Sequence, residues 1–341
     1  MTEPNRDINT EDEEETELPS RASTRFDPRL VTFLKGAPIF HQPNWLEVAT
    51  NGSYDYAVAW RGDEVAAVLP YRIKHKWGHT LSKMPEVTPY LGPWFRSCSA
   101  KYANRLGEEK DLVNELLASL PEFAHFHQSF HPLITNWMPF HWKGFSQSAH
   151  ITYWIDDTSD PDRMLSNTRD NIRTDMKKAK KSVEVRELDD FQLVLNMHKK
   201  TLARQGKSLQ HTDEFMSRLD AAAQTASSRK IFGAFDTQNR CHAVAYFLWD
   251  RHAVYYYTSG ADTELRNSGA GTLLIWNGIL LANQLGLGFD FEGSMNESID
   301  RFFRAFGGRQ ISVPTIQKTR SLLFFLKTQF ESGKNMFKSK T

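Results

Sequence analysis

The segment FDFEGSMNESIDRFFRAFGGR, residues 289–309, begins as a short apolar strand and continues as an amphipathic helix that ends at two glycines. Two acids, Asp290 and Glu292, interrupt the strand. Side chains two positions apart in a strand lie on the same face, so these carboxylates are predicted to share one face, with Phe289 and Phe291 on the other. Neighbouring, partly buried carboxylates have raised pKa values. We therefore predict that Asp290 and Glu292 act as a general base.

A structural role is the alternative for these two acids. Buried charges need partners, and the following helix carries Arg301 and Arg304. Ion pairs between these arginines and the acids would fix the strand to the helix without any catalytic role. The sequence leaves both interpretations open.

Length and composition favour a globular chain with two domains. The 341 residues are 40% hydrophobic and 12% aromatic, and the net charge of +1 gives no overall field for nucleic acid or membrane. Cys98 and Cys241 do not have metal-ligand spacing, so no metal site is predicted. With no apolar run of about 20 residues and an acidic N-terminus, neither a transmembrane segment nor a signal peptide is expected, and we predict a cytoplasmic protein.

Changes in composition divide the chain into four parts. Residues 1–25 are rich in acids and predicted to be disordered. An N-terminal domain is predicted for 26–150 and a C-terminal domain for 151–320, followed by a helix and basic tail over 321–341. In the first domain we expect a hairpin of strands 54–60 and 65–73, and a strand at 77–84 that extends its sheet. A helix at 104–120, a strand at 123–130, a helix at 132–142 and a strand at 150–156 are expected to follow.

The second domain is expected to be mixed rather than regularly alternating. A helix, a strand and an interrupted helical region precede three antiparallel strands, at 160–181, 183–188, 189–226, 230–235, 241–249 and 252–260. An apolar helix at 272–286 and the segment 289–309 follow. The predicted fold class is therefore α+β, with mainly antiparallel sheets flanked by helices.

A glycine-containing loop, LRNSGAGTLL, joins the third of these strands to the apolar helix. Glycines allow close approach to a ligand, and the amides at a helix N-terminus attract anions such as a pyrophosphate. The predicted anion-binding residues are Arg266, Asn267, Gly269, Ala270 and Gly271. An ordinary strand-to-helix turn is the alternative, because neither a dinucleotide fingerprint nor a P-loop is present.

Two further groups of residues are candidates for binding and chemistry. Arg169, Arg173 and Lys177 recur at four-residue steps, so they form a cationic face for phosphates of coenzyme A, of a nucleotide-linked precursor or of transfer RNA, unless that face is simply solvated. Tyr256 faces away from its two tyrosine neighbours and is a candidate proton donor. The candidates to line a substrate groove between the domains, unless they belong to the core, are Trp77, Tyr90, Trp94 and Trp142 with His75 and His79.

These motifs together resemble the GNAT acyltransferases, and in particular the Fem-type, double-GNAT branch. The resemblance covers roughly residues 26–320 and depends mainly on segments 167–185, 201–208, 255–262 and 289–308. It implies tandem GNAT-like domains and transfer of an acyl group from acetyl-CoA, or a related acyl thioester, to an amine of a cell-envelope or sugar-like precursor. In this family the loop at 266–271 would carry the pyrophosphate of coenzyme A.

One departure from the family pattern concerns the leaving group. Many GNAT enzymes have an Asn at the start of the last helix and, seven positions later, a Tyr that protonates the leaving thiolate. Asn296 matches, but Phe303 occupies the second position and cannot donate a proton. Two alternatives therefore stay open: a transferase that uses aminoacyl-tRNA, as in peptidoglycan cross-bridge synthesis, and a non-catalytic binding protein on the same fold.

Overall fold

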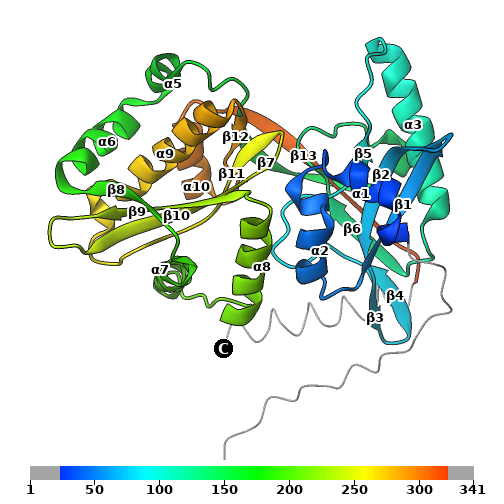
Figure 1. Ribbon diagram of the computed structural model, residues 1–341, viewed down its shortest axis with the longest axis horizontal. Helices are drawn as coiled ribbons and strands as arrows, with labels where there is room; N and C mark the ends of the chain where they lie inside the picture. The colour runs from blue at the N-terminus through cyan, green and yellow to red at the C-terminus, as the bar shows by residue number, and fades with distance from the viewer. Residues whose placement is uncertain (1–23, 322–341) are drawn as a thin grey trace, which may run out of the picture.

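The computed structural model describes residues 24–321 and shows two halves joined by a shared sheet (Figure 1). The N-terminal half contains α1 (Pro28–Leu34), α2 (Pro43–Ala49), β1 (Tyr54–Arg61), β2 (Glu64–Arg72), β3 (Lys74–Lys76), β4 (His79–Ser82), β5 (Trp94–Phe95), α3 (Tyr102–Ser119), β6 (His125–Ser129), α4 (Met138–Trp142) and β7 (Ser146–Ile155), with 3-10 turns η1 (Thr24–Phe26) and η2 (Ile39–His41).

The C-terminal half begins with α5 (Pro161–Asn167), α6 (Asp170–Ser182), β8 (Glu184–Leu188), α7 (Phe191–Arg204) and α8 (Asp213–Thr225). It continues with β9 (Arg229–Phe235), β10 (Cys241–Trp249), β11 (Ala253–Ala261), the turn η3 (Arg266–Ser268), α9 (Ala270–Leu285), β12 (Gly288–Asp290), α10 (Glu297–Arg304) and β13 (Arg309–Thr319). One sheet has the order β1-β2-β5, and the large sheet has the order β3-β4-β6-β13-β7-β12-β11-β10-β9-β8.

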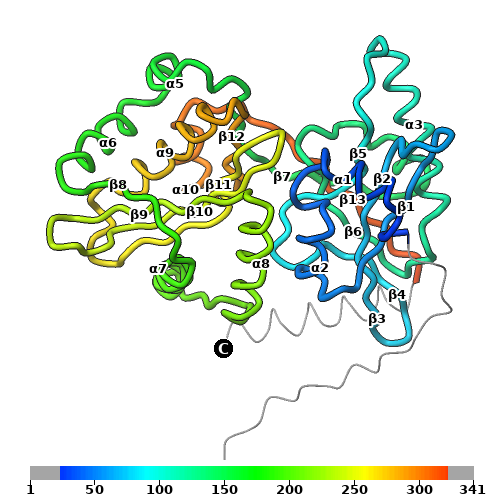
Figure 2. The backbone as a smooth tube through the Cα atoms, in the orientation of Figure 1, coloured from blue at the N-terminus to red at the C-terminus, as the bar shows by residue number. Residues whose placement is uncertain are grey.

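Strands β7 and β13 make the large sheet continuous between the halves. They pair antiparallel from Arg309 opposite Trp154 to Gln317 opposite Ser146. The far end of β13 also pairs with β6, and the far end of β7 pairs with β12. Figure 2 shows β13 running from one half into the other. The predicted boundary between 150 and 151 therefore falls inside β7, and the division into two domains stays a prediction.

Most predicted elements of the C-terminal half are present, and strands β9, β10 and β11 form the expected antiparallel meander. Four expectations need correction. Strand β13 was not predicted, although its apolar residues alternate in part. The strand expected at 77–84 joins the large sheet through β4 and β6, not the β1–β2 hairpin. The helix at 160–181 is divided near Thr168, and only α4 forms in 132–142. The predicted tail helix lies outside the described residues.

Helices cover both faces of the C-terminal half of the sheet. The apolar helix α9 packs on one face, where Gly278 lies so close to Phe247 that a Cβ atom would be 2.1 Å from its ring. Helix α7 covers the other face, and a Cβ on Gly260 of β11 would be 2.2 Å from the backbone carbon of Met197. No helix among the described residues is long and apolar enough to cross a membrane.

The contact between β11 and α7 gives a test of the fold. Gly260→Ala should lower the free energy of unfolding by about 3 kcal/mol, because the helix backbone cannot yield to a methyl group without repacking. Gly107→Ala is the matched control: Gly107 lies within α3 with no atom near its hypothetical Cβ, so alanine should stabilise by up to about 1 kcal/mol. Urea unfolding of both variants measures the difference, and equal stabilities would contradict the packing of α7 on β11.

Candidate active site

Strands β11 and β12 separate at the centre of the large sheet. They pair in parallel only from Ala253 with Gly288 to Tyr255 with Asp290. Strand β11 then continues to Ala261, whereas the segment after β12 turns away from it. The amide of Phe291 in that segment donates to the carbonyl of Tyr153 on β7. Within the described residues, β11 beyond Tyr255 therefore has no strand partner on this side, although the carbonyl of Ser259 and the amide of Ala261 are hydrogen-bonded to side chains of α7.

Asp290 is fully buried where the strands separate. Its Oδ1 accepts hydrogen bonds from Thr152 Oγ1 at 2.5 Å and from the amide of Glu292 at 2.8 Å. Burial raises the pKa of this carboxyl from 3.8 to about 7, against the opposing effect of these hydrogen bonds, and the charge of Asp250 adds to the rise. A carboxyl with a pKa near 7 is suited to accept a proton at neutral pH.

A tight turn places Glu292 beside Asp290. Strand β12 ends at Asp290, and Glu292 and Gly293 both have left-handed backbones, with φ of 55° and 60°. Gly293 is required here, because a Cβ would lie 1.9 Å from the carbonyl oxygen of Ile151. Left-handed backbone at a non-glycine residue is uncommon and is concentrated at functional sites. The acids are close, as predicted, but a turn and not strand alternation brings them together.

Three buried polar atoms around Asp290 make no hydrogen bond of good geometry among the described residues, although the Tyr90 hydroxyl lies close enough to Asp290 to lower its pKa. They are Asp290 Oδ2, Glu292 Oε1 and the hydroxyl of Tyr90. The charges of both acids help burial to raise the pKa of Tyr90, and burial together with Asp290 holds the pKa of Glu292 well above its usual value. Unpartnered polar atoms are rare in folded proteins, so a cluster of them indicates a ligand.

The ion pairs that the structural alternative requires are not formed among the described residues. Arg301 pairs with Glu297 and Arg304 lies 3.8 Å from Asp300, all within α10. Neither arginine pairs with Asp290 or Glu292, whose carboxylates instead face β7 and the N-terminal half.

The three tyrosines of β11 divide between the two faces of the sheet, as expected. Tyr255 and Tyr257 face the N-terminal half, where Tyr257 donates to the carbonyl of Val87 at 2.7 Å. Tyr256 faces α10, and its ring meets that of Phe303 edge-on with 5.9 Å between centroids. Burial raises the pKa of Tyr256 to about 12, so its phenol stays protonated. A phenol thus lies beside the residue that replaces the expected tyrosine.

The loop before α9 has the features of an anion site. The N-cap residue Gly269 offers no side chain, and no acceptor is found among the described residues for the amides of Gly271 and Thr272. The side chain of Arg266 is exposed and forms no ion pair with any of the described residues. Ala270 is buried, and Asn267 uses its carbonyl to accept a hydrogen bond from Lys178 of α6.

The two glycines of this loop have different roles. Gly269 has φ of 81°, and a Cβ would lie 2.4 Å from the carbonyl oxygen of Asp175 in α6. Close packing of this loop against α6 therefore explains why glycine is needed at position 269, and no ligand has to be invoked. A Cβ on Gly271 would meet nothing within 4 Å, so this position faces open space in which a ligand fits.

The predicted cationic face on α6 is only partly available for a ligand. Arg173 donates to the carbonyl of Thr168 and pairs with Asp170, so local bonds explain its position. Arg169 and Lys177 are exposed. Among the described residues no group of three or more histidine, cysteine or acidic side chains is arranged to hold a metal ion.

Sequence reasoning missed a buried network next to the site. His131 Nε2 lies 2.9 Å from the hydroxyl of Tyr255, which donates to Asp250 Oδ2 at 2.8 Å. Asp250 also accepts from the amide of Ile39, in the N-terminal half. His131 precedes Asp250 by 119 positions in the sequence, and Ile39 is further still from Asp250. No local pattern therefore indicates that these residues come together. Thr152 was missed for the same reason.

Comparison with known proteins identifies the class of the C-terminal half. Residues 166–302 match the family model described as acetyltransferase (GNAT) domain. A search of curated protein sequences finds no match. The match and the site geometry together support an acyltransferase, as predicted.

Solved structures show the same fold across both halves. FemX covers 84% of this chain and 95% of its own, with a TM-score of 0.64 and 12% identity. L-PGS from Bacillus licheniformis covers 90% and 96%, with a TM-score of 0.51 and 12% identity. The C-terminal domain of a putative lysylphosphatidylglycerol synthetase from Agrobacterium fabrum covers 88% and 93%, with a TM-score of 0.51 and 11% identity. The chain thus shares the fold of FemX over both halves, with a GNAT domain match in residues 166–302, and this confirms the fold that the resemblance implied.

Asp290 makes stability depend on pH in a defined direction. Its folded-state pKa of about 7 exceeds the usual 3.8, so the folded protein holds the proton more tightly and stability should fall as pH rises from about 4 to 7. This increase in the pKa of Asp290 corresponds to a change of roughly 4 kcal/mol at most in the free energy of unfolding. Asp290→Asn should remove much of this dependence when urea unfolding is measured at pH 5 and pH 8.

Glu297→Gln is the control for that experiment, because Glu297 is exposed and paired with Arg301. It should leave the pH dependence unchanged. Parallel behaviour of Asp290→Asn and the wild-type protein would contradict the buried, proton-holding state of Asp290.

Proposed function

We propose that the protein is an N-acyltransferase that moves an acyl group from acetyl-CoA, or a related acyl thioester, to an amine. The observation that carries this proposal is the cluster of unpartnered buried atoms on Asp290, Glu292 and Tyr90, located where two strands of a GNAT-fold sheet separate. Coenzyme A chemistry supplies the activated thioester, and the residues of this chain would bind, orient and deprotonate.

Donor binding is assigned to the loop before α9. The amides of Gly271 and Thr272 and the helix dipole favour negative charge, and Arg266 adds a cation that has no ion pair among the described residues. Lys178 is held against the same loop through the carbonyl of Asn267. These groups suit a pyrophosphate better than a neutral ligand.

Asp290 and Glu292, on the face of the sheet that is turned toward the N-terminal half, are assigned to the acceptor amine. As the amine nitrogen forms its bond to the thioester carbonyl carbon, its proton passes to Asp290, and the carbon–sulfur bond breaks. Glu292 lies beside Asp290, and the raised pKa of each carboxyl allows one of them to hold a proton. Thr152 positions Asp290 through its hydrogen bond.

Tyr256 is assigned to the leaving group. It is the first residue of β11 beyond the pairing with β12, and it faces α9 and α10 rather than the acids. The base and the donor of the proton therefore lie on opposite faces of the sheet. The phenol donates to the departing sulfur, a role that Phe303 cannot perform.

The acceptor is proposed to be an amine on a cell-envelope or sugar-like precursor. The Fem-like fold supports this class, and one structural neighbour is named as a lysylphosphatidylglycerol synthetase. Tyr90 brings the N-terminal half into the site, so acceptor choice would depend on both halves. A small-molecule or nucleotide-linked partner and a cytoplasmic location remain part of this proposal.

Aminoacyl-tRNA is the second candidate donor, and the exposed Lys177 on α6 and Arg169 at its N-cap favour it. The same face would contact phosphates of the acceptor end. Because Arg173 has partners within the chain, charge reversal there would disturb α6 and could not test tRNA binding cleanly.

Calorimetric titration of the purified protein with coenzyme A and, separately, with tRNA distinguishes the two donors. Coenzyme A should bind, and Arg266→Ala should weaken it about tenfold through loss of a charge-assisted contact. The control Arg251→Ala removes an exposed arginine from the turn between β10 and β11 and should have no effect. Salt-sensitive tRNA binding that is lost in Lys177→Glu, without coenzyme A binding, would support the second candidate instead.

The role of Tyr256 is tested by turnover of acetyl-CoA with a panel of amines, followed through the released thiol. Tyr256→Phe should lower kcat about 10- to 100-fold with little change in KM for the donor. Adding Phe303→Tyr to this variant should restore part of the activity, because the two rings are in contact. The control Tyr246→Phe alters a buried tyrosine on β10 that faces the other way.

Two outcomes would contradict this assignment. Full activity of Tyr256→Phe would mean that water or another group protonates the sulfur. Absence of turnover in the wild-type protein despite coenzyme A binding would favour a non-catalytic binding protein.

A further inference from the structure

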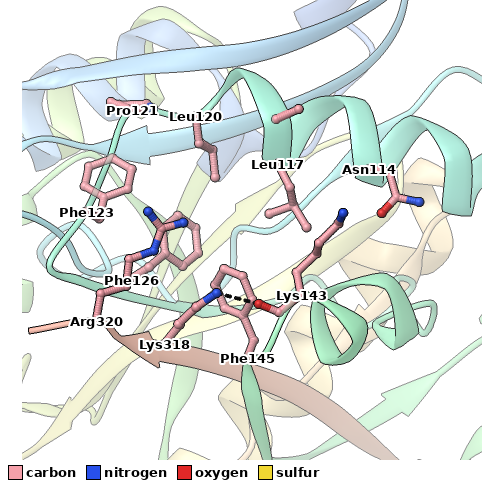
Figure 3. Close-up of a pocket in the computed structure, with 11 residues that line it drawn as sticks. Asn114, Leu117, Leu120, Pro121, Phe123, Phe126, Lys143, Phe145, Lys318 and Arg320 are labelled. Atoms are coloured by element: carbon pink, nitrogen blue, oxygen red, sulfur yellow. Dashed lines mark hydrogen bonds between the residues drawn. The ribbon is translucent and has the colours of Figure 1, made fainter.

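A cavity lies in the N-terminal half, away from the separated strands. It has a volume of about 190 Å³ and is formed by the end of α3, the segment before β6, the segment before β7 and the end of β13. Figure 3 shows its lining residues, and Figure 1 shows α3 on the opposite side of the molecule from α9. Neither the acyl donor nor the acceptor proposed above uses this cavity.

Three cations line this cavity, and none of the lining residues that the structure describes is a carboxylate. They are Lys143, Lys318 and Arg320. The ammonium of Lys318 donates to the backbone carbonyl of Lys143 and lies 5.3 Å from the ring centre of Phe145. Burial and the charges of Arg320 and Lys143 lower the pKa of Lys318. The three positive charges therefore repel one another, and an anion placed among them would relieve that repulsion.

The carboxylate that pairs with Arg320 within residues 24–321 does not neutralise these cations. Glu122 lies 3.7 Å from Arg320, but its side chain is 97% exposed and that of Arg320 is 53% exposed. Ion pairs of this kind contribute little to stability and are screened by salt. Arg320 can therefore turn toward a ligand at small cost.

The remainder of the lining is mostly apolar. Phe123, Phe126 and Phe145 form one side, and Leu117 and Leu120 of the α3 end form the other. In Figure 3 the nitrogen atoms of Lys318 and Arg320 lie next to these rings. Cavities of about 150 Å³ hold a benzene molecule. A cavity of 190 Å³ has room for a slightly larger apolar group with its charged end at the cations.

We propose that this cavity binds a small amphipathic carboxylate, with a chain of about six carbons or one aromatic ring. The guanidinium of Arg320 and the ammonium of Lys318 would hold the carboxylate, since arginine matches its two oxygens. The apolar part would cover the phenylalanine rings and leave water. A ligand with both parts uses the whole cavity, whereas inorganic phosphate uses only the cations.

The position of the cavity links its ligand to the shared sheet. Lys318 and Arg320 lie at and just beyond the end of β13, where Lys318 is opposite Phe126 of β6. A ligand bound there would join β13 to α3 and to the segment before β7. Binding to the folded state alone raises stability in proportion to the logarithm of ligand concentration over Kd.

Calorimetry and thermal unfolding of the full chain with hexanoate test the proposal. Hexanoate should bind saturably and raise the Tm, whereas hexanamide and inorganic phosphate should bind at least tenfold more weakly. Arg320→Gln and Lys318→Met should each weaken hexanoate binding at least tenfold. Ala118→Trp, which fills the cavity from an exposed position on α3, should abolish binding and keep all three cations.

Lys180→Met is the matched control, because Lys180 is an exposed lysine on α6. It should bind hexanoate as the wild-type protein does. Absence of saturable binding, equal binding of hexanamide, or wild-type affinity in Ala118→Trp would each overturn the proposal. Stronger binding of phosphate than of hexanoate would replace it with a simple anion site. Coenzyme A binding by Ala118→Trp, measured in parallel, shows that the variant is folded.

Discussion

The burial of the Asp290 carboxyl between β12 and β7 is the constraint on which the rest of the site depends. A carboxylate loses much hydration energy when it is buried, and Thr152 and the amide of Glu292 compensate for only part of that loss. The protein retains the group nevertheless, with one oxygen unpartnered. Such a cost is expected where a proton must be exchanged with a ligand, which is the role proposed for Asp290.

The sheet separates two chemical environments at this point. On one face, Asp290 and Glu292 lie against Tyr90 from the N-terminal half, which is the side assigned to the acceptor. On the other face, Tyr256 packs against Phe303 of α10 and belongs to the same core cluster as α9, the helix that begins at the proposed anion site. A thioester placed between β11 and β12 would contact both faces. The N-terminal half is therefore part of the site and is joined to it by the continuous sheet.

The sequence predicted those features that local patterns encode. Alternating and helical periodicity located the β9–β11 meander, α9 and the strand with Asp290, and the glycines marked the loop before α9. Tertiary contacts decided the rest. Nothing local indicates that Thr152 hydrogen-bonds to Asp290. Glu292 was placed by alternation, but a left-handed turn that requires Gly293 sets its position. Strand β13 was missed because its pairing depends on β6 and β7.

The most direct measurement is a crystal structure of the protein with acetyl-CoA. We expect the pyrophosphate at the amides of Gly271 and Thr272 with Arg266 in contact, and the thioester between β11 and β12 with its sulfur nearest Tyr256 and its carbonyl carbon on the side of Asp290. Acetyl-CoA bound in the N-terminal half, or with its thioester away from the separated strands, would contradict the account.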